Sequence, residues 1–205
     1  LIINILAFTV AYLLTKGIKG SNIFRTVFFM PNLIGGIVLG YIWSMIFDGI
    51  LSRYNTSILL NSTYGFWGLI ILMAWQQIGY MMIIYIAGLQ AVPGDMLEAA
   101  KIDGASDWKT LWDIIIPNVM PSITICTFLT LTNSFKLYDQ NLALTNGRPY
   151  NGAIHTTEML ALNIVNSNTL KTKGVGQAKA VMFFVLVAII GIFQMKSTHD
   201  KEVQQ

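Results

Sequence analysis

The chain has 205 residues, of which 54% are hydrophobic and only 11% are charged, and its mean hydropathy is +0.59. Soluble domains carry about 25% charged residues, so this composition excludes a water-soluble globular protein and predicts an integral membrane protein. The net charge of +3 is too small for a nucleic-acid-binding protein. The single cysteine, Cys126, excludes an intrachain disulfide and a thiolate metal cluster.

The chain opens on an apolar run of 14 residues, 1–14, which is followed by Lys16, Lys19 and Arg25. A membrane-spanning helix needs about 20 such residues. No basic segment precedes the run and no small-residue cleavage site follows it, which argues against a signal peptide. We interpret the run as the end of a span whose beginning is missing, and we expect an N-terminally truncated chain.

Four further segments are long and apolar enough to cross a bilayer. The first covers 26–47, which are 22 uncharged residues. Pro31 lies within it, and neighbouring helices can satisfy the carbonyl that a proline frees. Gly36 and Gly40 form a small-xxx-small pair that permits close helix approach. The other spans are expected at 66–90, 118–135 and 175–195. The predicted fold is therefore an all-α membrane domain of about five helices.

The basic residues of the short loops predict the orientation. Three of them lie in the loop at 15–25, whereas the loop at 48–65 has only Arg53. The positive-inside rule places the first loop in the cytoplasm and the second outside. By alternation, the segment 91–121 and the C-terminal tail are cytoplasmic, and the long segment 139–174 is external.

The cytoplasmic segment contains "EAAKIDGASDWKTLWDIIIPNVMP" at 98–121, a charged stretch between two apolar ones. Asp95 and Glu98 have the spacing of a capping box at the start of a short helix. Ala99 and Ala100 favour helix, and Gly104 suits a left-handed residue at the helix end.

A second helix is expected after Ser106, whose hydroxyl can cap it, and before Pro117 and Pro121. Its apolar side carries Trp108, Leu111, Trp112 and Ile115. From these residues alone two interpretations remain open: the tryptophans anchor the segment at the lipid headgroups, or the segment docks a cytoplasmic partner. Its acidic, alanine-rich composition suits anionic lipid poorly, which favours docking.

Glu98-Ala99-Ala100, Gly104 and Ile114-x-Ile116-Pro117 resemble, at their spacing, the EAA signature of binding-protein-dependent ABC importer permeases. That family usually has leucine where Ile116 stands. "DGASDW" and "IIIPNVMP" are similar to its carbohydrate branch. "LTNGRP" at 144–149 resembles the external LTxGGP segment of that branch, with Arg148 replacing a glycine, and "GVGQAKA" at 174–180 also fits. The resemblance covers nearly the whole chain and is closer to the first, maltose-type F-like permease of a heterodimer than to the second.

The resemblance implies a single type I ABC importer transmembrane domain over 1–205, with the EAA or coupling loop at 93–117 and an external loop at 139–174. In that family the loop enters a groove on the ATP-hydrolysing subunit. Small residues permit close approach, a glutamate offers a charge, and Trp108 and Trp112 would pack the second helix against the membrane domain. The implied coupling residues are Glu98, Ala99, Ala100, Asp103, Gly104, Ala105 and Trp108.

The sequence contains no G-x-x-x-x-G-K-[ST] motif and therefore lacks a P-loop. We expect no cofactor in this chain, since ATP and Mg would be bound by partner ABC ATPase subunits. The other implied partners are a second homologous permease, an extracellular or periplasmic solute-binding protein and membrane lipid, with no nucleic acid. The implied location is the bacterial or archaeal plasma (inner) membrane, as a multi-pass protein.

Polar side chains within the spans suggest a solute pathway. Amides and hydroxyls can exchange hydrogen bonds with the hydroxyls of a neutral sugar. The alternative is hydrogen bonding between helices, worth about 0.6 kcal/mol each. The candidates are Gln76, Gln77 and Tyr80 on one helix face, and Thr130, Asn133 and Ser134 on another. Counted without gaps from the EAA motif, the sugar contacts of the maltose-type permease match Gln76, Gln77, Tyr80, Thr130, Ser134 and Leu137, of which only Tyr80 is similar in type.

The leading hypothesis is a non-catalytic permease subunit of an ATP-driven importer for a sugar or oligosaccharide. An ABC permease for a polyol, glycerol-phosphate or peptide remains an alternative, as does an ATP-independent secondary transporter or channel. The expected spans hold no Asp, Glu or Arg near their centres, which disfavours ion-coupled transport and a phosphorylated solute. We find no convergent set of catalytic or metal-binding residues, which disfavours a membrane enzyme.

Overall fold

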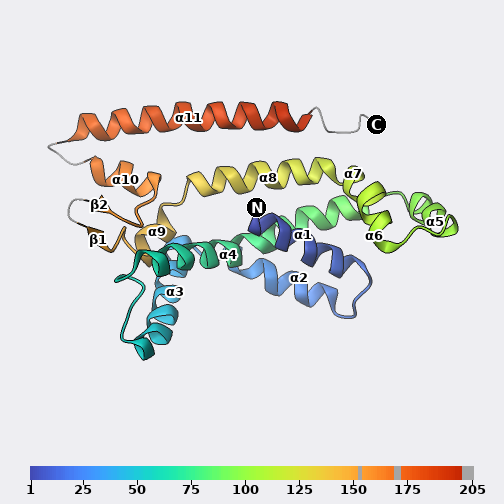
Figure 1. Cartoon of the computed structure of the whole chain (residues 1–205), viewed down its shortest axis with the longest axis horizontal. Coiled ribbons are helices and arrows are strands. Elements are labelled where there is room, and N and C mark those ends of the chain that lie inside the picture. The colour runs from blue at the N-terminus through green and yellow to red at the C-terminus, as the bar shows by residue number, and fades with distance from the viewer. Residues whose placement is uncertain (152–153, 169–171, 200–205) are drawn as a thin grey trace. The chain divides into compact units, whose positions relative to one another are not determined.

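The computed structural model describes residues 1–151, 154–168 and 172–199, and these are almost entirely helical (Figure 1). The strands in this part of the chain are β1 (Tyr150–Asn151) and β2 (Ile154–His155), an antiparallel pair in which Tyr150 faces His155. The all-α prediction is therefore confirmed. The chain divides into two compact units, which are described separately below.

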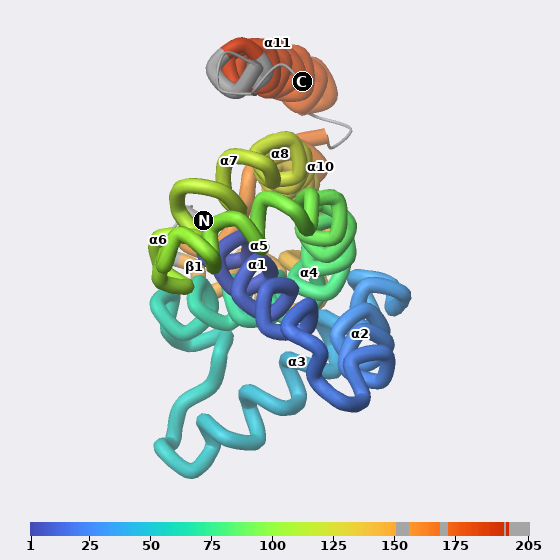
Figure 2. The backbone as a smooth tube through the Cα atoms, turned by 90° about the vertical axis from the view of Figure 1, so that its right-hand side faces the viewer, coloured from blue at the N-terminus to red at the C-terminus, as the bar shows by residue number. Residues whose placement is uncertain are grey.

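Unit 1 comprises Leu1–Met30, Gln77–Leu131 and the C-terminal part from Gly191. It contains α1 (Ile2–Thr15), α2 (Ser21–Phe29), the second half of α4 (Ser62–Gln90), and the first three quarters of α8 (Met120–Phe135). Between α4 and α8 lie α5 (Gly94–Ile102), α6 (Asp107–Thr110), the π-helical turn η3 (Leu111–Ile115) and α7 (Ile116–Asn118). In the tube view (Figure 2) a tight loop joins α1 to α2, and it contains Gly17 and Gly20 at positive φ.

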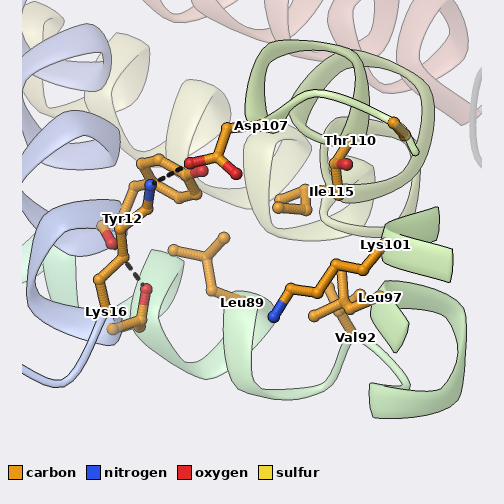
Figure 3. A pocket seen from close by; sticks show the side chains of 11 residues that line it. Tyr12, Lys16, Leu89, Val92, Leu97, Lys101, Asp107, Thr110 and Ile115 are labelled. Carbon is orange, nitrogen blue, oxygen red and sulfur yellow. Dashed lines mark hydrogen bonds and ion pairs between the residues drawn. The ribbon is translucent and has the colours of Figure 1, made fainter. Parts of the chain in front are cut away.

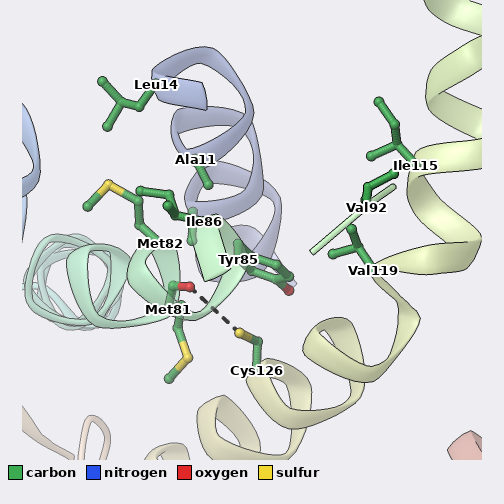
Figure 4. Close-up of a cluster of buried hydrophobic side chains, with 11 residues drawn as sticks. Ala11, Leu14, Met81, Met82, Tyr85, Ile86, Val92, Ile115, Val119 and Cys126 are labelled. Carbon is green, nitrogen blue, oxygen red and sulfur yellow. Dashed lines mark hydrogen bonds between the residues drawn. The ribbon is translucent and has the colours of Figure 1, made fainter. Parts of the chain in front are cut away.

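Small residues on α1 allow it to pack closely in unit 1. Ala7 and Ala11, one helical turn apart, are both fully buried. Figure 4 shows Ala11 beside Tyr85 and Ile86 of α4. In a bilayer there is little hydrophobic drive between helices, so such small side chains stabilise by dense van der Waals packing. The buried cluster contains Ala7, Ala11, Leu14, Met81, Met82, Tyr85, Ile86, Val92, Ile115, Val119 and Cys126.

Unit 2 comprises Pro31–Gln76 and Thr132–Ile190. It contains most of the short 3₁₀ turn η1 (Met30–Leu33), α3 (Gly36–Leu51), the turn η2 (Ser52–Tyr54) and the first half of α4. Then follow α9 (Asp139–Leu144), the β pair, α10 (Leu160–Ser167) and most of α11 (Lys173–His199). The expected connecting loop at 48–65 is partly helical, because α3 and η2 extend to Tyr54 and α4 begins at Ser62.

The close helix approach expected at Gly36 and Gly40 is confirmed, and the partner is α9. A Cβ on Gly36 would lie 2.9 Å from the Asp139 Cβ, and one on Gly40 would lie 2.5 Å from the Ala143 Cβ. Both distances are too short for a larger side chain. The glycine pair therefore fixes α9, and with it the start of the segment 139–174, against α3.

Two predicted spans are broken rather than continuous. The span expected at 26–47 contains a break, because Pro31 lies in a 3₁₀ turn and Gly35 is extended, with ψ of 142°, and the helical segments on either side are bent by 103°. Pro31 has no N–H to continue the helical ladder. The span expected at 118–135 begins after a 70° bend between Asp107–Asn118 and Met120–Phe135.

In the described residues, length and composition qualify Ser62–Gln90 and Lys173–Gln194 as membrane spans, or up to four spans if each bent pair counts as one. This confirms the spans expected at 66–90 and 175–195. The run at 1–14 forms the shorter apolar helix α1. These lengths agree with a multi-pass membrane protein.

Gly79 provides a test of unit 1. A Cβ at this position would lie 1.8 Å from the carbonyl oxygen of Phe28, so the backbones of α4 and α2 are in direct contact. We expect Gly79→Ala to destabilise the protein by about 1–3 kcal/mol, as overpacking does. The measurement is the thermal midpoint for loss of the monodisperse peak in mild detergent. Gly49→Ala is the control, since a Cβ on Gly49 meets nothing within 4 Å; an equal midpoint for both variants would contradict the contact.

Candidate functional site

Helix α5 begins the candidate docking site, and its start differs from the prediction. Pro93 is the N-cap residue and no side chain caps the helix, so the capping box predicted for Asp95 and Glu98 is wrong. The reason is that the helix already begins at Gly94, which puts Asp95 inside the first turn instead of before it. The Asp95 carboxylate there still interacts favourably with the positive end of the helix dipole.

The end of α5 is a left-handed turn at Gly104, as predicted. Gly104 has a φ of +75°. The Ala105 N–H donates to the Ala100 carbonyl at 2.9 Å, and the Gly104 N–H donates to the Lys101 carbonyl at 3.2 Å. This pair of hydrogen bonds is the Schellman arrangement, which satisfies two carbonyls at the helix end and reverses the chain direction.

The second helical segment starts at the residue predicted to cap it. The Ser106 hydroxyl oxygen accepts a hydrogen bond from the Lys109 N–H at 3.3 Å. The segment then continues past Pro117 instead of ending there, because the π-helical turn η3 precedes the proline and accommodates its missing N–H. The break falls at Val119, between the two prolines, and the Asn118 amide donates to the Ile114 carbonyl at 2.7 Å.

The outward surface of α5 combines apolar and acidic side chains. Ile102 is 86% exposed and Met96 is 48% exposed, and with the exposed Ala99 they follow one another at intervals of three residues. We call Met96, Ala99 and Ile102 the outer face of α5. Glu98 and Asp103 are exposed beside it, whereas Ala100 is only 6% exposed and packs inward. Gly104 is also exposed.

Sequence reasoning singled out Ala99 but missed Met96 and Ile102. The signal was available: apolar residues spaced by three in a short polar helix form a stripe. A large aliphatic side chain that is 86% exposed has no packing role within the chain. This stripe is therefore surface that a partner can cover.

The two tryptophans correct another expectation. Trp108 is 68% exposed and Trp112 is 52% exposed, and their rings contact each other edge to face with centroids 5.7 Å apart. They do not pack the second helix tightly against the rest of unit 1. Both instead line one side of an open apolar cavity of about 490 Å³, and α1 lines the other side. Ala105 is half-buried at the turn between the helices.

Within unit 1, the pathway candidates are partly engaged in local hydrogen bonds. Thr130 is 7% exposed, and its hydroxyl donates to the Cys126 carbonyl at 2.7 Å and lies 3.4 Å from the Asn4 side-chain oxygen. Gln77 is 8% exposed and Tyr80 is half-buried. The Thr130 side chain therefore contributes to the packing of α8 against α1.

Within unit 2, Gln76 supports the helix-packing alternative. Its amide nitrogen donates to the Ile34 carbonyl at 3.3 Å, and its oxygen accepts from the Gln140 amide at 2.8 Å. Gln76 therefore joins α4 to the break before α3 and to α9. Asn133 is half-buried and Ser134 is exposed. The six candidates are divided between the units, and within α4 Gln76, Gln77 and Tyr80 remain neighbours.

A buried polar network organises the segment after α9, and sequence reasoning missed it. Asn141 is fully buried; its amide nitrogen donates to the Thr145 hydroxyl at 3.0 Å and to the Thr157 carbonyl at 2.9 Å, and its oxygen accepts from the Met159 N–H at 2.9 Å. Thr157 also donates to the Arg148 carbonyl. These hydrogen bonds hold 141–148 and 157–159 against each other.

Comparison with known proteins identifies what the chain is similar to. A family model, binding-protein-dependent transport system inner membrane component, matches residues 3–196. The probable starch degradation products transport system permease protein AmyD of Thermoanaerobacterium thermosulfurigenes is 42% identical over 99% of this chain and 71% of its own length. The multiple sugar-binding transport system permease protein MsmF of Streptococcus mutans is 30% identical over 97% of this chain and 71% of its own length.

A solved structure shares the fold. It is a bacterial alginate ABC transporter in complex with an alginate pentasaccharide-bound periplasmic protein, and the likeness has a TM-score of 0.72 over 92% of this chain and 69% of that one, at 16% identity. The expected type I ABC importer transmembrane fold is thereby confirmed.

The Asn141 network can be tested by proteolysis. Asn141→Leu removes three hydrogen bonds and leaves buried backbone groups unpaired, which costs about 1–3 kcal/mol for each such group. We expect faster protease cleavage within 144–159 in detergent-solubilised protein. Thr156→Val, which removes an exposed hydrogen bond to the Pro149 carbonyl in the same segment, is the control and should change the cleavage rate little. Equal rates for wild type and Asn141→Leu would refute the role of the network.

Proposed function

The chain belongs to the binding-protein-dependent transport system inner membrane components, and from this membership we propose that it is the permease subunit of an ATP-driven importer for a sugar or oligosaccharide. The relatives named above, which match nearly all of this chain, carry starch products and multiple sugars in their names. The observation that carries the coupling part of the proposal is the exposed helix α5 with its fixed ends.

Helix α5 has the properties of an insertion element. Its ends are fixed by Pro93 and by the left-handed turn at Gly104, so little conformational entropy is lost when it enters a groove. The outer face supplies apolar area, and Glu98 and Asp103 supply charges for basic groups around it. The proposed partner is a cytoplasmic ATPase subunit that binds ATP and Mg, which places the loop 93–117 on the cytoplasmic side.

This chain itself would perform no chemistry. Movement of the ATPase subunits would push on α5, and the rigid turn at Gly104 would transmit the push through α6 and η3 to the spans. An ATP-independent secondary transporter, the alternative, has no need for an exposed docking helix with fixed ends. A membrane enzyme would need a convergent reactive set, and the sequence suggests none.

The proposed solute is a neutral saccharide. Neither α4 nor α8 contains a single charged residue, so a phosphorylated solute would find no Arg or Lys on these helices. The pathway candidates on α4 are Gln76, Gln77 and Tyr80, and the hydrogen bonds of Gln76 and Thr130 indicate that these two also serve helix packing. A polyol or peptide permease of the same family is the second candidate.

Two further partners complete the proposal. A second homologous permease would form the other half of the translocation pathway. A solute-binding protein would dock at the external side, where the Asn141 network joins Thr145 to Thr157 and Met159. Arg148 and Tyr150 lie in the same segment, with the guanidinium 5.6 Å from the ring centroid.

The turn at Gly104 predicts a graded response to substitution. A Cβ at this position meets nothing within 4 Å, so within the chain itself the effect of a side chain is due to the backbone φ of +75°. We expect Gly104→Val to uncouple ATP hydrolysis from solute uptake, because a left-handed conformation costs about 1–2 kcal/mol and more for a branched residue. Gly104→Asn, which tolerates this conformation, should retain most uptake. Equal uptake by both variants in cells, at equal membrane levels, would contradict the proposal.

Substitutions on or beside the outer face of α5 should weaken binding of the ATPase subunit. Ile102→Asp places a charge in the proposed apolar contact, and Glu98→Lys reverses the charge beside it. We expect both variants to insert normally but to retain at least tenfold less ATPase subunit during affinity purification, a loss of about 1.4 kcal/mol or more. Ile18→Asp is the control, because Ile18 is 45% exposed but lies in the loop after α1. Retention equal to wild type in Ile102→Asp would exclude this face as the contact.

A further inference from the structure

A second cavity lies behind the docking loop, between α1, α4 and the turn from α5 to α6. Its volume is about 500 Å³. Figure 3 shows Lys16, Lys101 and Asp107 around it together with aliphatic side chains. Lys16 pairs with Asp107 at 3.3 Å, whereas Lys101 extends toward Leu89 and has no ion pair or hydrogen bond among the described residues. Although the segment 93–117 as a whole is acidic, the charged side chains that line this cavity carry one unbalanced positive charge.

This cationic cavity adjoins the apolar cavity described above. Tyr12 lines both of them, and the Lys16 ammonium lies 4.7 Å from the centroid of its ring. The apolar cavity is lined by Ile5, Phe8 and the two tryptophans among others. The apolar cavity, which we also call the groove, and the cationic cavity are therefore adjacent, with Tyr12 between them.

The two cavities lie at the level along the helices where the surface of a bilayer is expected. The cationic cavity lies where α1 ends at Thr15 and α4 ends at Gln90, and charged residues follow both ends. Tryptophan is enriched at the level of the headgroups, and Trp108 and Trp112 lie beside this boundary. Each cavity also falls within the range of roughly 300–1,000 Å³ that is typical of ligand sites.

We propose that the two cavities together bind one anionic phospholipid, with its phosphate beside Lys101 and Lys16 and an acyl chain in the groove between α1 and the Trp108–Trp112 pair. The chemistry of the ligand follows from the lining: a negative head for the unbalanced lysine, and a hydrocarbon tail for a groove almost without polar atoms. The position on the membrane surface rests on the proposed placement of the loop 93–117. A lipid held there would contact α1 and the docking loop at once, and would connect the lipid composition of the membrane with the coupling helix.

The test uses a photoreactive phospholipid. The full-length chain, with the subunits that copurify, is placed in phosphatidylcholine nanodiscs that contain a minority of phosphatidylglycerol carrying a photoreactive acyl chain. We expect adducts on peptides from α1 or from 108–123. Lys101→Gln should lower the yield about fivefold, which is the usual contribution of one lysine to binding of an anionic lipid.

Lys109→Gln is the matched control. It removes the same charge from the same loop, but Lys109 does not line the cationic cavity, and the yield should not change. Phosphatidylcholine with the same photoreactive chain should label equally in both variants, and free inorganic phosphate should not compete. Equal phosphatidylglycerol labelling of Lys101→Gln and Lys109→Gln would overturn the proposal. A photoreactive amino acid at position 9, which lines the groove, that cross-links to another protein chain instead of lipid would overturn it as well. Neither result depends on whether an ATPase binds α5.

Discussion

The left-handed turn at Gly104 is the constraint on which the proposed mechanism depends. Two hydrogen bonds from Gly104 and Ala105 end α5, and the Ser106 hydroxyl starts the next helix two residues later. A helix of nine residues would be marginal in water without such fixed ends. Here both ends are set by local backbone geometry, so α5 can expose its apolar outer face and still keep its shape. In the proposed mechanism, a force on that face would be passed to η3 and α8.

The polar side chains of the spans are constrained by their hydrogen bonds within the protein. In a bilayer every polar group must find a partner within the protein, because no water is present to supply one. Gln76 bonds to Ile34 and Gln140, and Thr130 bonds to the Cys126 carbonyl. These polar side chains stabilise the packing of helices, at the break before α3 and within unit 1. The pathway candidates Gln77 and Tyr80 lie on the same helix as Gln76.

Much of this structure follows from local sequence rules. The positive φ at Gly104, the cap at Ser106, the two long spans and the close approach at Gly36 and Gly40 were all predictable, because each depends on one residue type and its neighbours. The break after Pro31 and the continuation of the helix through Pro117 were not predictable from the sequence. A proline in a membrane helix can either end the helix or be accommodated by a π-helical turn.

Long-range features were beyond sequence reasoning. The Asn141 network joins residues 141 and 159, and nothing in the pattern of single residues marks a buried asparagine. The exposure of Trp108 and Trp112 depends in the same way on where α1 lies in the fold, whereas the family resemblance implied that both pack against the membrane domain. The exposed Ile102, in contrast, was visible as a stripe at intervals of three and was missed.

The most direct measurement is a photo-cross-link from position 99, at the centre of the outer face of α5, made in living cells and analysed by mass spectrometry. The proposed function predicts an adduct with a chain that contains a P-loop, and a yield that changes when ATP is depleted. An adduct with lipid alone, in cells that express such an ATPase, would contradict it and would make α5 a membrane-surface anchor.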